Sequence, residues 1–196
     1  MPAWIWIVVA YLIGSVSFAV VVSKLFALPD PHSYGSGNPG ATNVLRTGNK
    51  VAAAITLFGD GAKGWLAVFL AKLFAPEIDP LTLAAVALAV FLGHVFPVFH
   101  KFQGGKGVAT AAGIMLAIDW RLFAAATAVW LVFALTLKIS SISALAAAVA
   151  APIFAFWFFG NGPLAWAFVV IALLLFWRHK GNIEKLLAGR ETTIGR

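Results

Sequence analysis

Long apolar runs limit what this chain can fold into more than any other feature of its sequence. Of its 196 residues, 62% are hydrophobic and 11% are charged, whereas a typical soluble domain is about 45–50% apolar and about 25% charged. A soluble core of this length could not bury so much apolar surface, so lipid must cover the remainder. The composition therefore predicts an all-α integral membrane protein. With no linker or internal repeat, residues 1–196 are expected to form one polytopic domain.

The number of these runs, and their lengths relative to the thickness of a bilayer, predict a bundle of about seven transmembrane helices. The candidate spans cover approximately residues 2–26, 51–75, 81–99, 108–118, 122–137, 139–159 and 163–177. The first run has neither a basic leader nor an obvious cleavage site, so we interpret it as a retained span. At about 1.5 Å of rise per residue, the fourth run covers only part of a hydrocarbon core about 30 Å thick, which also allows a re-entrant segment.

The distribution of basic residues favours seven crossings. If all seven runs cross and the N-terminus is outside, one side receives eleven basic residues: Lys24, Arg46, Lys50, Lys101, Lys106, Lys138, Arg178, Lys180, Lys185, Arg190 and Arg196. The other side receives Lys72 and Arg121, together with Glu77, Asp79 and Asp119. Because lysine and arginine concentrate in cytoplasmic loops, we expect a cytoplasmic C-terminus. A re-entrant fourth run would place the basic tail on the opposite side from the other two basic loops.

The net charge and the residue types that are missing exclude several kinds of chemistry. The formal charge of +7 indicates cytoplasmic loops and anionic lipids or substrates, and no segment resembles a nucleic-acid-binding module. The chain has no cysteine, which excludes thiolate metal sites and cysteine nucleophiles. Its acidic residues form no close cluster with histidine, so we predict neither a metal nor another cofactor.

The segments 27–50, 100–107 and 178–196 are the predicted cytoplasmic loops, and each combines glycine, basic residues and small polar groups. The first contains an anion-binding nest, because its glycines allow conformations that turn backbone N–H groups inward. Its candidate ligands are Gly35, Ser36, Gly37, Asn38, Gly40, Thr42, Asn43 and Arg46. A polar turn between two spans is the alternative interpretation. The spacing of a Walker loop is absent, which disfavours nucleotide hydrolysis.

The second loop places a lysine among glycines at the start of an apolar helix, an arrangement that favours phosphate binding. Its candidates are Gly104, Gly105, Lys106 and Gly107, with His94, His100 and Lys101 as secondary candidates. Lys101 is more simply explained as a positive-inside anchor. Because His94 falls within the third span, an interhelical hydrogen bond is its simpler explanation.

The third loop offers His179 and Asn182, which would share one face of a continuing helix because they are three residues apart. Arg178 and Lys180 could equally be anchors. Ile183, Leu186 and Leu187 follow at helical spacing, which predicts a short helix in the membrane interface.

One further pair of charged residues lies inside the second span. Asp60 and Lys63 are three residues apart, and ionisable residues within a span are usually functional or paired with one another. A structural ion pair and a wall of the site are both consistent with this spacing.

Together these motifs resemble the bacterial acyl-phosphate:glycerol-3-phosphate acyltransferases, the PlsY family. Segments 35–43, 93–107 and 178–189 match that family in order, and so does the Asp60-x-x-Lys63-Gly64 pattern. The resemblance implies transfer of a fatty acyl group from acyl phosphate to the 1-hydroxyl of sn-glycerol 3-phosphate, giving lysophosphatidic acid and phosphate. This reaction is the first acylation of bacterial phospholipid synthesis, and we expect it at the cytoplasmic face of the inner membrane.

The roles that follow from this resemblance are expectations. Arg46 and Lys106 would hold phosphates, aided by Ser36, Asn38, Thr42 and glycine N–H groups, while His179 and Asn182 would orient glycerol 3-phosphate. The acyl phosphate is already activated, which favours direct attack without an acyl-enzyme. The base could be His179 or an oxygen of the acyl phosphate itself.

A transporter of phosphorylated solutes is the main alternative function, but the two-halved symmetry usual for transporters is absent. A non-catalytic scaffold subunit is a second alternative, and it would leave the three polar loops unexplained.

Overall fold

The structure, a computed structural model, describes residues 2–194, and every regular element in this range is a helix. The α-helices are α1 (Ala3–Gly14), α2 (Phe18–Leu25), α3 (Ala41–Leu45), α4 (Lys50–Phe74), α5 (Pro80–Val95), α6 (Val108–Ile118), α7 (Trp120–Leu137), α8 (Ser140–Phe159), α9 (Pro163–Arg178) and α10 (Lys180–Leu187), with one 3-10 turn, η1 (Val98–His100). The prediction of an all-α protein is therefore confirmed over the described residues.

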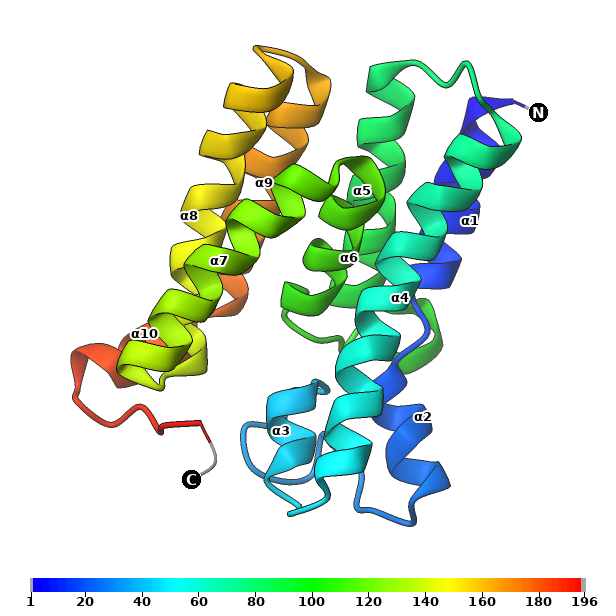
Figure 1. Cartoon of the computed structure of the whole chain (residues 1–196). Helices are drawn as coiled ribbons and strands as arrows, with labels where there is room; N and C mark the ends of the chain where they lie inside the picture. The colour runs from blue at the N-terminus through cyan, green and yellow to red at the C-terminus, as the bar shows by residue number, and fades with distance from the viewer. Residues whose placement is uncertain (1, 195–196) are drawn as a thin grey trace.

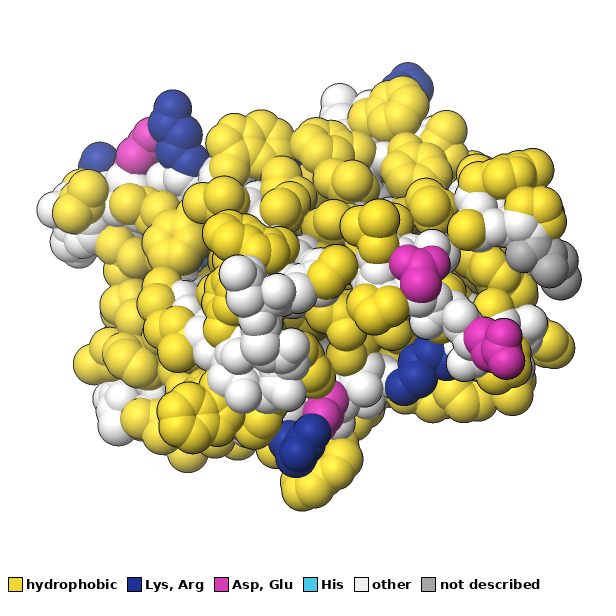
Figure 2. Space-filling view, turned by 90° about the horizontal axis from the view of Figure 1, so that it is seen from above, with side chains coloured by type: hydrophobic (Ala, Val, Ile, Leu, Met, Phe, Trp, Pro, Cys, Tyr) yellow, Lys and Arg dark blue, Asp and Glu magenta, His cyan; other side chains and the backbone are white. Residues whose placement is uncertain are grey.

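The long helices run up and down through one bundle (Figure 1). The N-terminus lies at the upper end, and α2, α3, α10 and the C-terminal segment lie at the lower end. We call the lower end, with residues 26–49, 96–107 and 179–194, the polar end, and the upper end the opposite end. Seen from above, the opposite end is mostly hydrophobic with a few charged side chains (Figure 2).

Fewer segments are long enough to cross a membrane than the seven that the sequence predicts. Five segments are long and apolar enough to cross a membrane: Ala3–Leu25, Lys50–Phe74, Pro80–His100, Trp120–Leu137 and Ser140–Phe159. A sixth appears if α9 and α10, which meet at a bend of 58°, are counted together. Helix α6 has 11 residues and is too short to qualify, although the chain reverses direction after it (Figure 1). Seven crossings therefore stay a prediction.

The first apolar run is not one continuous helix, because α1 ends at Gly14 and α2 begins at Phe18. Gly14 lies so close to the backbone of Val90 in α5 that a β-carbon there would clash. The break leaves backbone groups without helical partners, and the Lys63 ammonium donates to the carbonyl of Val16 at 2.6 Å. A buried side chain from α4 therefore stabilises the interruption, as irregular backbone inside a membrane requires.

Small residues allow close helix packing next to the polar end. In α4, Gly64 lies against the backbone of Thr110 in α6, and Gly113 of α6 lies against Gly61. Such small-residue contacts are typical of helix pairs in membranes. The contact fixes the start of α6, and the loop before it, against the second span. Many large apolar side chains point outward instead; Trp157 is 83% exposed, as expected where lipid covers the surface.

Candidate active site

Polar side chains from the three predicted loops meet at the polar end. The Lys106 ammonium donates a short hydrogen bond to Oδ1 of Asn182. The amide nitrogen of Asn182 donates to Oε1 of Glu191 at 2.6 Å, and Arg46 Nη2 donates to the hydroxyl of Thr192 at 3.3 Å. Residues from positions 46, 106, 182 and 191–192 thus form one contact network, which we call the loop cluster.

Asn43 holds the first loop together. Its amide nitrogen donates to the carbonyls of Pro31 and Tyr34, at 2.8 and 3.2 Å. Its oxygen accepts from the backbone N–H of Ser36 at 3.0 Å and from Arg46 Nη1 at 3.1 Å. These four bonds use the hydrogen-bonding capacity of the amide. Sequence reasoning named Asn43 as a substrate ligand, but this geometry assigns it to positioning the loop and Arg46.

The other candidates of the first loop are arranged around this amide. Gly35 adopts a φ of 60° and packs so closely on Asn43 and Arg46 that a β-carbon would clash with the Asn43 oxygen. Ser36, Gly37 and Thr42 are exposed, whereas Asn38 and Gly40 are partly buried. Within residues 2–194, the side chains of Ser36, Asn38 and Thr42 make no internal hydrogen bond, so their polar atoms are available to a ligand.

The second loop is fixed from two sides. The N–H of Gly105 donates to the carbonyl of His94 at 3.1 Å. From the other side, Arg178 donates to the carbonyls of Gly104 and Gly105 at 2.6 and 3.1 Å. A β-carbon on Gly105 would clash with the His94 ring, so the backbone approaches this ring as only glycine can. The sequence left open whether Arg178 is only an anchor; the structure shows it joining the third loop to the second.

Lys106 is partly buried next to the N-terminus of α6, where Gly107 occupies the N-cap with a φ of 94°. Burial lowers the pKa of Lys106 to about 8. The carboxylate of Glu191 opposes this shift, while the charges of Arg46, Arg178 and Lys185 add to it. Lys106 therefore carries an ammonium in a crowded positive environment, which an anionic ligand would stabilise.

His179 is buried at the junction between α9 and α10, and its Nδ1 lies 2.8 Å from the carbonyl of Leu175. A carbonyl oxygen can only accept, so this bond requires a proton on Nδ1 and leaves Nε2 with a lone pair in the neutral ring. Burial, together with the charge of Lys106, lowers the pKa of His179 to about 4. The ring is therefore neutral near pH 7, with Nε2 as its acceptor.

The sequence analysis missed Glu191 and Thr192 of the loop cluster, and also Ser141, which contacts Glu191. Oε1 of Glu191 accepts from Ser141 Oγ at 2.9 Å as well as from Asn182, so the carboxylate links the tail to the start of α8. The only signal for Glu191 in the sequence is an acidic residue within a basic tail. Ser141 carries no signal at all, because its contact joins residues 50 positions apart.

Asp60, Lys63 and His94 form a separate buried group inside the bundle. Lys63 Nζ lies 2.9 Å from Asp60 Oδ1, and the two side chains are 3% and 5% exposed. Nδ1 of His94 lies 3.6 Å from the same oxygen. Of the two interpretations left open by the sequence, the structural ion pair agrees with these contacts. Gly105, the residue before Lys106, donates its N–H to the carbonyl of His94 and so connects this group to the second loop.

His100 and Lys101 lie at the polar end, at the start of the second loop. Lys101 is exposed with a φ of 52°, and His100 is partly buried. Neither is joined to the loop cluster by a hydrogen bond among the described residues. Instead, His32 links the first two loops, since its ring nitrogens lie 2.8 Å from Asp30 and 3.1 Å from the carbonyl of Gln103.

The described part of the chain contains no group of three or more histidine, aspartate or glutamate side chains arranged to hold a metal ion.

Comparison with known proteins places this bundle and its polar end in a class of membrane-embedded acyltransferases. The crystal structure of PlsY, an integral membrane glycerol 3-phosphate acyltransferase, in its glycerol 3-phosphate form, superposes with a TM-score of 0.92 and 36% identity, covering 98% of this chain and 96% of that one. A glycerol-3-phosphate acyltransferase of Cupriavidus taiwanensis is 64% identical over 188 residues, or 95% of this chain and 93% of its own. One of Cupriavidus pinatubonensis is 62% identical with the same coverage.

The family model for glycerol-3-phosphate acyltransferase matches residues 4–189. The chain therefore belongs to the glycerol-3-phosphate acyltransferase family and is an integral membrane acyltransferase. The resemblance drawn from the three sequence segments is confirmed.

Proposed function

We propose that this protein transfers a fatty acyl group from acyl phosphate to the 1-hydroxyl of sn-glycerol 3-phosphate, forming lysophosphatidic acid and inorganic phosphate. This would be the first acylation of phospholipid synthesis in a bacterium. The observation that carries the proposal is the loop cluster, in which Arg46, Lys106 and Asn182 from three separate segments lie in one contact network. Both substrates carry phosphate, and one also carries an apolar chain, so a cationic site at the end of an apolar bundle suits both.

Phosphate recognition falls to the charged and glycine-rich parts of the cluster. Lys106 supplies a charge next to the free N–H groups at the start of α6, which favours an anion by both charge and helix dipole. Arg46 supplies a second cation, since it is exposed and its other contacts are to neutral groups. The hydroxyls of Ser36 and Thr42 and the amide of Asn38 then complete the hydrogen bonding of the phosphate oxygens.

The chemical step is direct attack on the carbonyl carbon of the acyl phosphate. The 1-hydroxyl oxygen forms the new ester bond, the bond from the carbonyl carbon to the phosphate oxygen breaks, and phosphate leaves with the bonding electrons. His179 accepts a hydrogen bond at Nε2 from the neighbouring 2-hydroxyl of glycerol 3-phosphate and so orients the 1-hydroxyl toward the carbonyl, leaving the 1-hydroxyl proton free. An oxygen of the departing phosphate takes the hydroxyl proton, which makes the reaction substrate-assisted and needs no acyl-enzyme.

The same proposal gives the membrane arrangement. The polar end faces the cytoplasm, because it gathers the basic loops and positive residues concentrate on that side. Glycerol 3-phosphate would then reach the loop cluster from water, while the acyl chain would enter from the bilayer. In a bacterium with two membranes, this is the inner membrane.

A transfer assay tests this proposal. Purified protein is incubated with glycerol 3-phosphate and acyl phosphate, and in parallel with acyl-CoA or acyl-acyl carrier protein as donor; Lys106→Ala protein is the control. We expect lysophosphatidic acid and phosphate from acyl phosphate alone, with much lower activity in the control. Absence of product with every donor would contradict the reaction, and equal use of acyl-CoA would contradict the donor.

A further inference from the structure

A recess on this molecule lies away from the loop cluster. It has a volume of about 610 Å³ and is lined by Lys72 and by residues 116–121. These residues form the turn between α6 and α7, which lies below the upper ends of α5, α8 and α9 (Figure 1). The recess arises because α6 is short: at about 1.5 Å per residue, its 11 residues rise roughly half the thickness of a hydrocarbon core.

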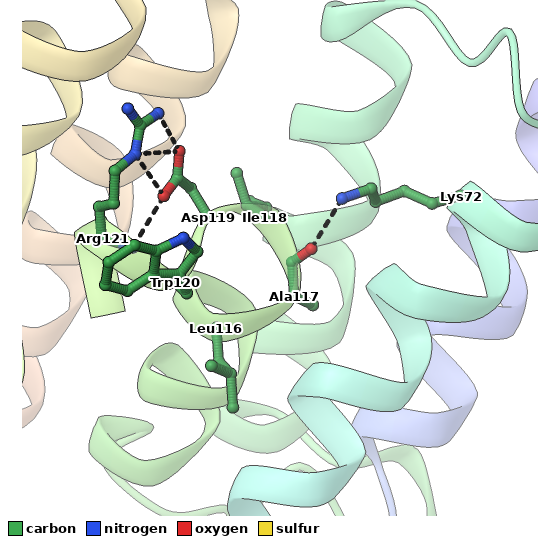
Figure 3. A pocket seen from close by; sticks show the side chains of 7 residues that line it. All are labelled: Lys72, Leu116, Ala117, Ile118, Asp119, Trp120 and Arg121. Atoms are coloured by element: carbon green, nitrogen blue, oxygen red, sulfur yellow. Dashed lines mark hydrogen bonds and ion pairs between the residues drawn. The ribbon is translucent and has the colours of Figure 1, made fainter. Parts of the chain in front are cut away.

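Asp119 is the residue that ends α6 and starts α7. Its Oδ1 accepts from the backbone N–H of Arg121 at 2.8 Å, as the N-cap of α7. The same carboxylate accepts from Nε and Nη2 of Arg121, with the shortest bond at 2.6 Å. Asp119 and Arg121 therefore neutralise one another on one flank of the turn (Figure 3).

Lys72 lies on the other flank of the turn. Because Asp119 and Arg121 neutralise one another, the ammonium of Lys72 is the unbalanced charge of the lining. It reaches from α4 to the carbonyl of Ala117 near the end of α6, at 2.9 Å (Figure 3). An ammonium has three N–H donors, so two are left for another partner. Among the described residues that line the recess, Lys72 has no carboxylate within ion-pair distance. The lining as a whole carries one net positive charge, which matches the single negative charge of a phosphodiester.

The remaining walls of the recess are apolar. Leu116, Ala117, Ile118 and Trp120 contribute them, and Leu116 and Trp120 are 41% and 69% exposed. Tryptophan is enriched where a membrane meets water, because its ring is apolar and its N–H is polar. A free phosphate ion would gain nothing from these walls, whereas an amphiphile would use both the cation and the apolar surface.

We propose that this recess is a lipid-binding site, in which the phosphodiester of a membrane phospholipid binds the Lys72 ammonium and its acyl chains lie along Leu116 and Trp120. The site belongs to the leaflet opposite the loop cluster, so it is separate from the site of acyl transfer. The bound lipid fills the space that the short α6 leaves in the bundle and stabilises the α6–α7 turn.

Native mass spectrometry of the full-length protein in nonionic detergent tests this site. Dioleoyl phosphatidylglycerol is added at increasing concentration, and bound lipid is counted for wild type and for three variants. Lys72→Gln keeps a donor for the Ala117 carbonyl but loses the charge, Lys72→Arg keeps the charge, and Lys50→Gln removes an exposed charge from the other end of the same helix.

We expect Lys72→Gln to bind one tightly held lipid about fivefold more weakly, because a basic residue at a membrane surface contributes about 1 kcal/mol to binding of anionic lipid. Lys72→Arg and Lys50→Gln should bind as wild type does. Equal lipid binding by wild type and Lys72→Gln would overturn the proposal.

Two further probes distinguish a phospholipid site from simpler ones. Inorganic phosphate and dioleoylglycerol are added separately, and the thermal unfolding temperature is measured for wild type and Lys72→Gln. Only phosphatidylglycerol should raise this temperature more in wild type than in the variant. If inorganic phosphate gives the same difference in unfolding temperature, the recess is a simple anion site. If dioleoylglycerol gives it, the recess does not recognise the lipid phosphate. Either result would overturn the proposal.

Discussion

Lys106 is the residue whose charge should control substrate binding, and its protonation gives the first prediction. Burial places its pKa at about 8, so the ammonium is present below that pH and is lost above it. We therefore expect KM for glycerol 3-phosphate to rise as pH increases through about 8, with a smaller change in kcat. Initial rates at pH 6 to 10 would measure this. Lys106→Arg, whose side chain stays charged throughout, should remove that rise; a wild-type KM that stays constant to pH 10 would contradict this role.

His179 gives the second prediction at this scale. If its neutral ring only directs the hydroxyl and the phosphate takes the proton, His179→Ala should lower kcat by about 10- to 100-fold, less than the upper range of 10²–10⁴ seen for loss of general acid–base catalysis. The measurement is kcat at saturating concentrations of both substrates. Nearly full activity would exclude His179 from the step, whereas a loss of about 10⁴-fold or more would make it the obligatory base.

At the scale of elements, Arg178 joins the end of α9 to the loop before α6. Its guanidinium donates to two successive carbonyls, a geometry that lysine cannot reproduce. We expect Arg178→Lys to raise KM for glycerol 3-phosphate by about tenfold, because loss of one charge-assisted bond of about 1.5 kcal/mol would let the Lys106 loop move. The exposed neighbour Lys180 provides the control: Lys180→Ala should leave KM unchanged. A fall in kcat alone for Arg178→Lys would indicate contact with the reacting atoms rather than positioning.

The elements also show what the sequence could predict. Apolar runs bounded by polar segments placed the helices well; the run at 51–75, for example, is α4 (Lys50–Phe74). The break after Gly14 could not be predicted, because its causes lie on α5 and in Lys63, 47 residues from the carbonyl that it binds. The same holds within the loop cluster. The glycine-rich motifs identified Arg46 and Lys106 as candidates, but only tertiary contacts show that Asn43 makes all its hydrogen bonds within its own loop and that Glu191 takes part.

For the whole molecule, the orientation in the membrane is testable because the chain has no cysteine. Single cysteines at Thr42 and Leu187, both exposed at the polar end, and at Glu77, exposed at the opposite end, are treated with a membrane-impermeant maleimide on intact cells. We expect labelling of Glu77→Cys alone, with the other two labelled only after the cells are broken. If Leu187→Cys is labelled in intact cells and Thr42→Cys is not, α6 does not cross and the loop cluster cannot assemble as described.

The central claim is that three separate loops form one site for phosphorylated substrates, and a double-mutant cycle between Lys106 and Asn182 tests it most directly. These residues are 76 positions apart and joined by a hydrogen bond. Wild type, Lys106→Ala, Asn182→Ala and the double variant are compared by kcat/KM for glycerol 3-phosphate. Residues that act in one network show coupling of about 0.5–3 kcal/mol, so the double variant should be clearly more active than the product of the two single effects predicts. Independent effects that simply multiply would contradict a single shared site.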